Sequence, residues 1–510
     1  MKKIYLLILG VLIFNAPTKA QTWATEIAPI IYNNCTKCHH DGGIAPFSLM
    51  TYSEVTNRIA GIKYQVEQGS MPPWPADQQY RHYAYERVLK PSEINAIVNW
   101  ANAGTPSGDL SKAPAQPVYL KGSKIGAYDL KIKIPVYTST ATTGDVYRCF
   151  SIQSGVKTEQ FISDIEIVPG NPKIVHHVLV FQDTTNTTNQ LDNQDPLPGY
   201  TNFGGTGSNN SVLMAPYVPG SEPVHFPKST GIKMFRNSNV ILQIHYPEGT
   251  DGEIDSTYVL IRFAKPGSTR EVFIAPILNH GNITNGPFAI PANSVKTFYQ
   301  SMTVPIDASL LSVMPHMHLI GKSTKVFAKP LIADTIPLVR INDWDFHWQG
   351  EYKFQYLQKI PKGSKLQSIV TYDNTSANPN QPSDPPKLVT LGEATTSEMM
   401  LTYFYYMAYQ SGDENILQDS SLLLSTPRLR DITGIQLFPN PSGQKFQIHL
   451  PNNVPNAHLQ VLNLLGQTVF ESTLNQANTS IEHQLTPGIY HVRISTNDGT
   501  WNEKLQVIKE

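Results

Sequence analysis

Short apolar runs separated by turn residues fill the central part of the chain, from about Val118 to Tyr409. Runs such as HHVLVF, NVILQIHY and YVLIRFA are rich in β-branched and aromatic residues, and many of the 39 prolines and 33 glycines lie between such runs. This spacing favours β-sandwiches over long helices. A chain of 510 residues is also too long for a single core, so we expect several domains.

The start of the chain and its charge narrow the class of protein further. Residues 1–20 begin with a basic region, continue with an apolar run and end with small residues before Gln21. This pattern predicts a secretory signal peptide cleaved after Ala20, since the apolar run is too short to span a bilayer well. The net charge of −1 gives no indication of nucleic-acid binding, and three cysteines are too few for a disulfide-stapled scaffold.

Changes in pattern along the chain predict a multidomain fold class. A small all-α domain is followed by two β-sandwiches and by a small β-sandwich tail. The expected boundaries are 1–20 for the signal peptide, 21–112 for the helical domain, 118–270 and 271–412 for the two sandwiches, 413–432 for a linker and 433–510 for the tail. In the helical part, PSEINAIVNWANAG predicts a helix with Ser92 as its N-cap and Gly104 just beyond its end.

A C-x-x-C-H motif lies in the predicted helical domain, in the stretch NCTKCHH. Cys35 and Cys38 would form thioether bonds to a c-type haem, and His39 would become an iron ligand. A disulfide or half of a zinc site are the alternatives, but a zinc site needs more ligands at suitable spacing and the chain has no second cysteine pair. The motif therefore predicts covalent haem c.

A second haem ligand is expected downstream of this motif. The Pro-rich stretch EQGSMPPWP offers Met71, with His40 and His82 as lesser candidates. A methionine on such a loop, between C-x-x-C-H and a closing helix, resembles the small class I cytochromes c over about ninety residues. The resemblance implies an electron carrier, since His/Met ligation raises the reduction potential of haem iron.

Histidines and methionines recur in the β-rich region. They are His176 and His177 in KIVHHVLVF, His245 in LQIHYPEG, His316 and His318 in SVMPHMHLIGKS, and Met399 and Met400 in TTSEMMLTYFYY. Taken singly, each is more typical of a core residue than of a metal ligand. His316 and His318 would share one face of a regular strand, whereas His176 and His177 would not. A shared metal at His176 and His177 therefore predicts that their strand is bulged or ends there.

These segments, in this order, resemble the copper type II ascorbate-dependent monooxygenases, the family that includes peptidylglycine α-hydroxylating and dopamine β-monooxygenases. The resemblance spans about residues 128–409 and implies two jelly-roll-like copper domains. It assigns His176, His177 and His245 to an electron-storing copper. It assigns His316, His318 and Met399 to an oxygen-binding copper, with Met399 preferred to Met400 because it directly follows Glu398. Imidazole binds both oxidation states of copper, and a thioether favours Cu(I).

The resemblance implies hydroxylation of an aliphatic C–H bond with O₂, two copper ions and an external reductant or electron-donor protein. The upstream haem motif indicates that haem c supplies these electrons. Where the peptide-hydroxylating relatives have an arginine and an asparagine that anchor a substrate carboxylate, this chain has Met314 and Leu401, and only the matching Tyr403 remains. A peptide carboxylate is therefore not the expected substrate, which is an unidentified small organic molecule.

The last part of the chain has its own pattern of strands and turns. LFPNPSGQKFQIHL, LQVLNLLGQTVF and LTPGIYHVRIS resemble the C-terminal sorting domain of type IX secretion. The resemblance implies the type IX secretion machinery as a partner, passage through the periplasm, removal of the tail, and a secreted or cell-surface protein. An ordinary carbohydrate-binding or Ig-like module is the alternative.

Two other functions remain open from the sequence. One is a non-catalytic protein that binds haem and copper or relays electrons. The other is a different copper oxidoreductase, for example one that makes peroxide from O₂. A zinc site is also open, because three protein ligands and a water are typical of catalytic zinc, although methionine is not a usual zinc ligand.

Overall fold

A computed structural model describes residues 21–119, 123–267, 269–418, 430–431, 435–451, 457–463, 468–496 and 499–509. The chain divides into two compact units, residues 1–418 and 419–510. The predicted signal peptide lies outside the described residues. Within the described residues, no helix is long and apolar enough to cross a membrane.

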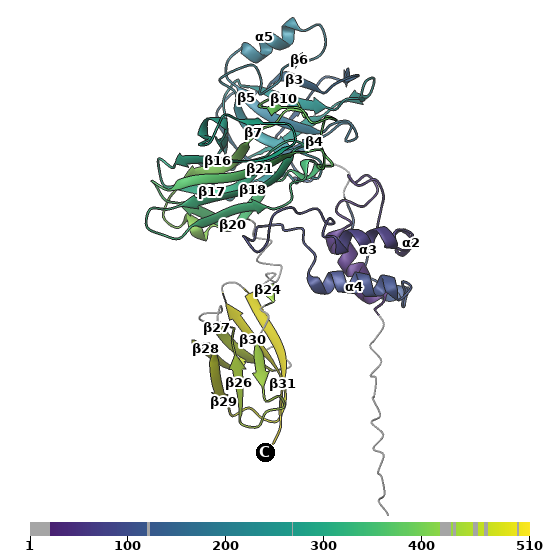
Figure 1. Ribbon diagram of the computed structural model, residues 1–510, viewed down its shortest axis with the longest axis vertical. Helices are drawn as coiled ribbons and strands as arrows, with labels where there is room; N and C mark the ends of the chain where they lie inside the picture. Colours follow the sequence, from purple (N-terminus) through teal and green to yellow (C-terminus); the bar gives the residue numbers. More distant parts are fainter. Residues whose placement is uncertain are drawn as a thin grey trace, which may run out of the picture. The chain divides into compact units, whose positions relative to one another are not determined.

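The first part of the larger unit is helical, and Figure 1 shows α2, α3 and α4 grouped together. Its elements are η1 (Trp23–Ile27), α1 (Ala28–Asn34), α2 (Tyr52–Thr56), α3 (Ile59–Glu67), α4 (Pro91–Asn102) and η2 (Leu110–Lys112). Trp23, Ile27 and Trp100 are buried in one small core. The predicted N-cap at Ser92 is wrong by two residues, because α4 begins at Pro91 and its N-cap is Lys90. The amide of Lys90 donates a hydrogen bond to the carboxylate of Glu93 in the first turn of this helix.

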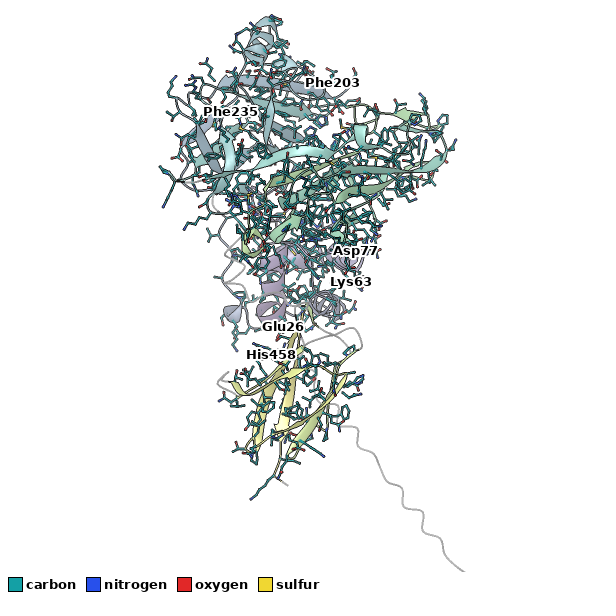
Figure 2. The ribbon with its side chains drawn as sticks, turned by 90° about the vertical axis from the view of Figure 1, so that its left-hand side faces the viewer. Glu26, Lys63, Asp77, Phe203, Phe235 and His458 are labelled. Atoms are coloured by element: carbon teal, nitrogen blue, oxygen red, sulfur yellow. The ribbon has the colours of Figure 1, made fainter. Side chains whose placement is uncertain are left out.

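The segment between α3 and α4 has no regular structure and packs on the second β-sandwich. Ala76 forms a β-bridge with Ile341, and the hydroxyl of Tyr83 donates to the carbonyl of Leu338 at 2.7 Å. Asp77, labelled in Figure 2, forms an ion pair with Arg340 of the sandwich, and its Oδ2 lies 2.6 Å from Nη2 of that arginine. These backbone and side-chain contacts fix this segment to the sandwich.

Residues 130–271 form the first sandwich, in which two sheets enclose an apolar core. One sheet has the order β1-β12-β4-β9-β13 with β8 beside β4, the other has the order β6-β3-β10-β5-β7, and β2 pairs with β11. The elements are β1 (Leu130–Lys133), β2 (Tyr137–Thr138), β3 (Val146–Gln153), β4 (Gln160–Val168), β5 (His177–Asp183), α5 (Thr187–Gln194), β6 (Tyr200–Thr201), β7 (Val212–Tyr217), β8 (Val224–His225), β9 (Thr230–Met234), β10 (Asn239–Tyr246), β11 (Ile254–Asp255), β12 (Tyr258–Phe263) and β13 (Arg270–Glu271).

Residues 273–408 form the second sandwich. Its sheets have the orders β14-β23-β17-β20 and β16-β21-β18-β19, and β15 pairs with β22. The elements, with one turn beyond the last strand, are β14 (Phe273–Leu278), η3 (His280–Asn282), β15 (Ala289–Ile290), β16 (Ser294–Thr303), β17 (Ala308–His316), β18 (Gly321–Lys329), β19 (Ile336–Ile341), η4 (Phe346–Trp348), β20 (Tyr352–Ile360), β21 (Lys365–Asn374), β22 (Val389–Thr390), β23 (Leu401–Ala408) and η5 (Asp413–Asn415).

The two sandwiches share apolar core. The cluster that fills the first sandwich includes Val178 and Ile244, and it continues into Leu311 and Tyr405 of the second sandwich. Leu311 and Tyr405 are at most 2% exposed. The face of the sheet β14-β23-β17-β20 that carries Tyr405 is therefore buried against the first sandwich.

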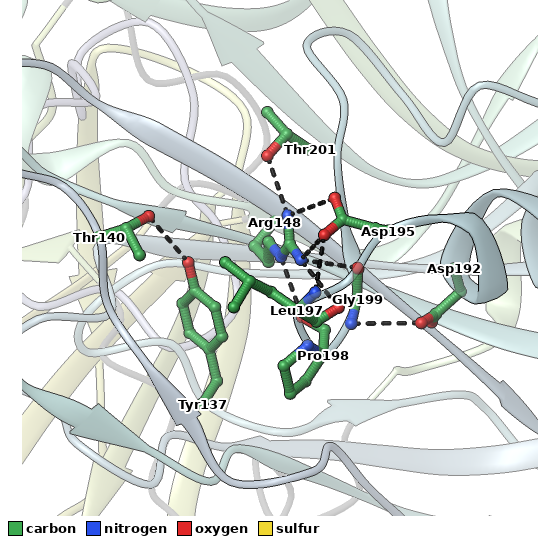
Figure 3. Close-up of polar contacts among 9 residues, drawn as sticks. All are labelled: Tyr137, Thr140, Arg148, Asp192, Asp195, Leu197, Pro198, Gly199 and Thr201. Carbon is green, nitrogen blue, oxygen red and sulfur yellow. Dashed lines mark hydrogen bonds and ion pairs between the residues drawn. The ribbon is translucent and has the colours of Figure 1, made fainter.

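An arginine organises the loop that follows α5, at the edge of the first sandwich (Figure 3). Arg148, from β3, forms an ion pair of 2.8 Å with Asp195 and donates to the carbonyls of Leu197, Pro198 and Gly199. This guanidinium lowers the pKa of the Asp195 carboxyl. The buried guanidinium holds the loop between α5 and β6 in place, because it donates to several of the loop's carbonyls.

The smaller unit is a separate β-sandwich with its own core, which includes Phe446, Val461 and Leu505. Its sheets have the orders β24-β31-β30-β27-β28 and β25-β26-β29. The strands are β24 (Arg430–Asp431), β25 (Gln436–Phe438), β26 (Lys445–His449), β27 (Ala457–Leu462), β28 (Thr468–Leu474), β29 (Asn478–Glu482), β30 (Gly488–Thr496) and β31 (Gly499–Val507).

Candidate metal centres

Three histidines meet at one end of the first sandwich. His177 begins β5 and lies opposite His245 of β10, and the amide of His176 donates to the carbonyl of His245 at 3.0 Å. The predicted interruption of the strand is confirmed, because β5 begins at His177 and His176 lies outside the alternation of its side chains. The three imidazoles can therefore face one point.

The nitrogen positions of this three-histidine cluster fit one metal ion. Nδ1 of His177 lies 3.5 Å from Nδ1 of His176 and 3.3 Å from Nδ1 of His245. Nitrogens about 2.0 Å from one metal ion, at trigonal or tetrahedral angles, are about 3.3–3.5 Å apart. Burial, together with the imidazole of His245, lowers the pKa of His176 to about 4, and burial lowers the pKa of His177 well below its usual range. Both rings are therefore neutral near pH 7, as metal ligands must be.

Neighbouring side chains hold the ring of His245. Tyr147 stacks on it with ring centroids 4.4 Å apart, and Phe203, labelled in Figure 2, packs against Tyr147 at 5.0 Å. Nε2 of His245 lies 3.3 Å from Oδ2 of Asp145, and this contact lowers the pKa of the Asp145 carboxyl. A carboxylate behind a histidine ring orients the ring toward a metal. The hydroxyl of Thr395, from the second sandwich, also donates to Asp145.

The second pair of histidines lies at the end of β17. The strand ends at His316, and His318 follows in the connection to β18, so strand alternation alone does not place them together. Their ring centroids are nevertheless 5.1 Å apart at 84°. Nδ1 of His316 is 2.5 Å from Oε1 of Gln349, and Nδ1 of His318 is 3.0 Å from the carbonyl of Ser397. Both partners are acceptors, so each Nδ1 carries the proton and each Nε2 keeps a free lone pair.

Burial also keeps this pair neutral. It lowers the pKa of His316 to about 3 and that of His318 to about 4, and the adjacent imidazole of His318 contributes to the shift of His316. Neutral imidazoles with Nδ1–H tied to oxygen acceptors are arranged as metal ligands are in proteins.

A buried glutamate connects this pair to the predicted methionine ligand. The carboxylate of Glu398 accepts hydrogen bonds from the amides of His318 at 2.8 Å, Ile320 at 2.8 Å and Met399 at 3.2 Å. Burial raises the pKa of Glu398 to about 8, although these amides act in the opposite direction. One side chain thus joins the segment of His318 to the segment of Met399.

The two neighbouring methionines differ in their surroundings. Met400 is 1% exposed and belongs to the core of the second sandwich, and its amide donates to Nε2 of His280 at 2.9 Å. Met399 is 8% exposed and is not part of that core cluster, and its carbonyl accepts from the hydroxyl of Tyr372. This difference is consistent with Met399 as the ligand, which stays a prediction.

Replacing Glu398 with glutamine tests the connection between the two segments. Above pH 8, where the carboxyl of Glu398 is ionised, the introduced glutamine would replace an acceptor oxygen with a donor that faces backbone amides, so we expect the free energy of unfolding to fall by about 1–3 kcal/mol. We also expect copper affinity at His316 and His318 to fall about 10- to 100-fold, as for other partners of metal ligands. Thermal unfolding and copper titration measure the two effects.

Glu393 is the matched control for this substitution. It is a half-buried glutamate of the same loop, and its side chain points at Gly204. Glu393→Gln should leave copper affinity at His316 and His318 unchanged. Equal affinities in Glu398→Gln and the unsubstituted chain would show that the carboxylate of Glu398 does not position the ligands.

The residues of the expected substrate pocket share one face of the sheet with His316. In the pairing of β17 with β23, Met314 lies opposite Tyr403 and His316 lies opposite Leu401. Residues directly opposite each other point to the same face, and alternate residues of a strand do so too. Burial raises the pKa of Tyr403 to about 12, so its hydroxyl keeps its proton.

One aromatic ring contacts both groups of histidines. Phe346, in η4, stacks on His176 with centroids 5.4 Å apart at 20°, and it meets His318 edge-on with centroids 6.1 Å apart. Its side chain thus lies between the three-histidine cluster and the pair at the end of β17. Sequence reasoning missed Phe346, Gln349 and Asp145, because no motif marks them and each lies far from its partner along the chain.

The C-x-x-C-H residues follow α1 directly. The amide of His39 donates to the carbonyl of Cys35 at 3.0 Å, and that of Cys38 donates to the same carbonyl. Both cysteines are free thiols, and burial raises the pKa of Cys35 to about 12. Nδ1 of His39 lies 3.1 Å from the carbonyl of Phe47, an acceptor, so Nδ1 carries the proton and Nε2 is available to a haem iron.

The candidates for a second haem ligand are in different surroundings. Met71 is half-buried in the loop after α3. Nδ1 of His40 lies 2.7 Å from the carbonyl of Thr36, and His82 is exposed and contacts the carboxylate of Glu86. Met71 therefore stays the preferred prediction.

One comparison with known proteins identifies the tail. Residues 436–509 match the model of the family described as secretion system C-terminal sorting domain. The prediction of a sorting tail is confirmed, and the chain is a secreted or cell-surface protein.

The chain is similar, over about half of its length, to two hydroxylases. Over 259 residues the chain is 25% identical to tyramine beta-hydroxylase of Caenorhabditis briggsae, which covers 47% of this chain and 41% of that protein. Over 261 residues it is 24% identical to dopamine beta-hydroxylase of Canis lupus familiaris, with 47% and 39% covered. The chain thus spans about two fifths of the length of these curated relatives. A solved structure of PNGF-II is 11% identical, with 55% of this chain and 66% of that chain covered and a TM-score of 0.25.

Proposed function

We propose that the chain is a copper monooxygenase that hydroxylates an aliphatic C–H bond of a small organic molecule with O₂. The observation that carries the proposal is the convergence of His176, His177 and His245, whose ligand nitrogens lie within 4.8 Å of one another, with Nδ1 of His177 3.5 and 3.3 Å from the Nδ1 atoms of the other two. The similarity to two hydroxylases supports the class of reaction.

The remaining ligands define a second and different metal site. His316 and His318 would offer Nε2, and Met399 would offer a thioether, a donor set that suits Cu(I) better than zinc. Bound at these two sites, copper would supply the electrons that reduce O₂ and the activated oxygen that attacks the C–H bond. The chain's own groups keep the imidazoles neutral, fix their orientation through Gln349 and Glu398, and shield them from water.

The face beside His316 sets what the substrate can be. Met314 and Leu401 are apolar, and Tyr403 stays neutral near pH 7 and can only share a hydrogen bond. A substrate carboxylate would be left without a cation there, which is costly in a buried site. We therefore propose a substrate whose bound part is apolar or carries only neutral polar groups.

We also propose that haem c, bonded to Cys35 and Cys38 with His39 as an iron ligand, supplies electrons to the copper sites. The support is the motif itself and the hydrogen bond that leaves Nε2 of His39 free. An external reductant or donor protein would reduce the haem.

The experiment that tests the function begins with metal content, by elemental analysis together with a pyridine haemochrome spectrum. We expect two copper ions and one covalent haem per chain. A screen of small organic molecules should then give O₂ uptake that depends on the molecule, with a hydroxylated product. Zinc in place of copper would overturn the proposal, as would peroxide without product or reversible redox without O₂ consumption.

A further inference from the structure

We propose that Trp348 and Phe346 form an aromatic path for electrons between the haem edge at Cys38 and the three-histidine cluster. The inference rests on the proposed binding of haem and copper. It adds the route, which neither the C-x-x-C-H motif nor the copper ligands define. Both aromatic residues belong to one 3-10 turn, η4, which connects β19 with β20.

The copper end of the path is a direct ring contact. Phe346 is 9% exposed and lies nearly parallel to the imidazole of His176, with centroids 5.4 Å apart. His176 is one of the three proposed ligands of the electron-storing copper. An electron that reaches Phe346 is therefore one ring contact from a ligand of that copper.

The haem end of the path meets Trp348 at Gly220. A Cβ atom built on Gly220 would lie 3.8 Å from Cζ3 of Trp348 and 2.9 Å from Cδ1 of Ile44. Ile44 lies five residues after His39, in the loop that follows the haem motif. Gly220 has a φ of +85° and no side chain, so Ile44 and Trp348 can both lie close to its backbone.

Charged groups lie in the same region of the sandwiches. Nη1 of Arg87 would lie 3.9 Å from the same Cβ position on Gly220, and Lys124 and Glu222 form an ion pair of 3.3 Å. The amide of Ala45, next to Ile44, donates to the carbonyl of Cys38 at 3.2 Å. The loop that approaches Gly220 is thus joined to the haem motif by a backbone hydrogen bond.

Nε of Arg87 is buried and has no hydrogen-bond partner. This leaves a donor for an acidic group such as a haem propionate.

The proposed step is the transfer of one electron. Ferrous haem is oxidised by one electron and Cu(II) at the three-histidine cluster is reduced by one, with no bond formed or broken. The aromatic side chains carry the electron without holding it. The oxidant and the reductant are the two groups already proposed for this chain.

The test measures this transfer directly, without O₂ and without substrate. The chain loaded with haem and Cu(II) is given a pulse of photogenerated reductant, and the decay of the reduced haem band is followed. We expect Trp348→Leu to slow this decay severalfold, and Trp348→Phe to restore most of the rate. Trp348 is not one of the proposed haem or copper ligands, so haem content, copper content and both reduction potentials should not change.

The matched control is His347→Leu, in the same turn. The side chain of His347 is 69% exposed and lies beside the proposed path, where it contacts Asp345 and meets the ring of Phe346 edge-on with centroids 5.8 Å apart. Its variant should transfer electrons at the unsubstituted rate. Equal rates in Trp348→Leu and the unsubstituted chain, with potentials and melting temperature preserved, would overturn the path. Absence of a haem band would instead overturn both the proposed haem and the path. The proposed copper chemistry would then still be tested by the assay for hydroxylated product.

Discussion

Replacing Met399 with leucine should abolish hydroxylation while leaving the haem spectrum and the fold intact. Leucine has nearly the same volume but no thioether, and such swaps usually cost less than about 1.5 kcal/mol of stability. Loss of a direct ligand should exceed the effect of losing a partner of a ligand, so we expect turnover to fall by more than about 100-fold. Product formation with a responsive substrate, and copper content, measure the result.

Met400→Leu is the matched control, because it makes the same change one residue away. Met400 lies in the core of the second sandwich, so its variant should lose little stability and keep its turnover. The opposite pattern, with turnover lost in Met400→Leu and kept in Met399→Leu, would identify Met400 as the ligand instead of Met399. Unchanged turnover in both variants would remove methionine from the oxygen-binding site.

Replacing His245 with alanine should remove the copper of the three-histidine cluster and stop turnover. His245 is 2% exposed and supplies one of the converging Nδ1 atoms, and two histidines from one short segment cannot complete the set. We expect copper affinity at the cluster to fall by more than about 100-fold, so that only the other copper remains after dialysis. Elemental analysis and the Cu(II) electron paramagnetic resonance spectrum check this result.

His225→Ala is a suitable control for this loss. Nδ1 of His225 contacts the carboxylate of Asp164, so it too is a histidine paired with an aspartate in the first sandwich. Its side chain is 47% exposed, and it should keep full copper content. If His245→Ala retained both copper ions, the cluster would not be a copper site.

The sequence predicted which histidines lie close together, because the segments that contain them, in their order along the chain, resemble those of a known family. Two adjacent histidines at a strand end predicted an interrupted strand, and β5 does begin at His177. The alternation rule was less useful for His316 and His318, since the strand stops at the first of them. There, Glu398 fixes the backbone around His318 by accepting hydrogen bonds from three amides. Such contacts do not repeat along the chain, so no sequence pattern predicts them.

Residues that act from a distance could not be predicted. Gln349 orients His316 from 33 positions away, and Asp145 lies behind His245 from a different strand connection. Their partners are defined only when the two sandwiches have folded, because single polar residues in loops are common for many reasons. The fold class was easier to predict, since strand periodicity is repeated many times along the chain whereas a contact between loops occurs once.

The apolar cluster common to both sandwiches limits how this protein can move. Hinge opening, as in many two-lobed enzymes, requires lobes that separate along a hydrated or weakly packed surface. Here, separation would expose Leu311 and Tyr405 together with the residues of the first sandwich that cover them. The spacing between the three-histidine cluster and the histidine pair at the end of β17 is therefore a fixed property of a single folded body. Swapping either sandwich alone for that of a relative would expose the apolar core that both share.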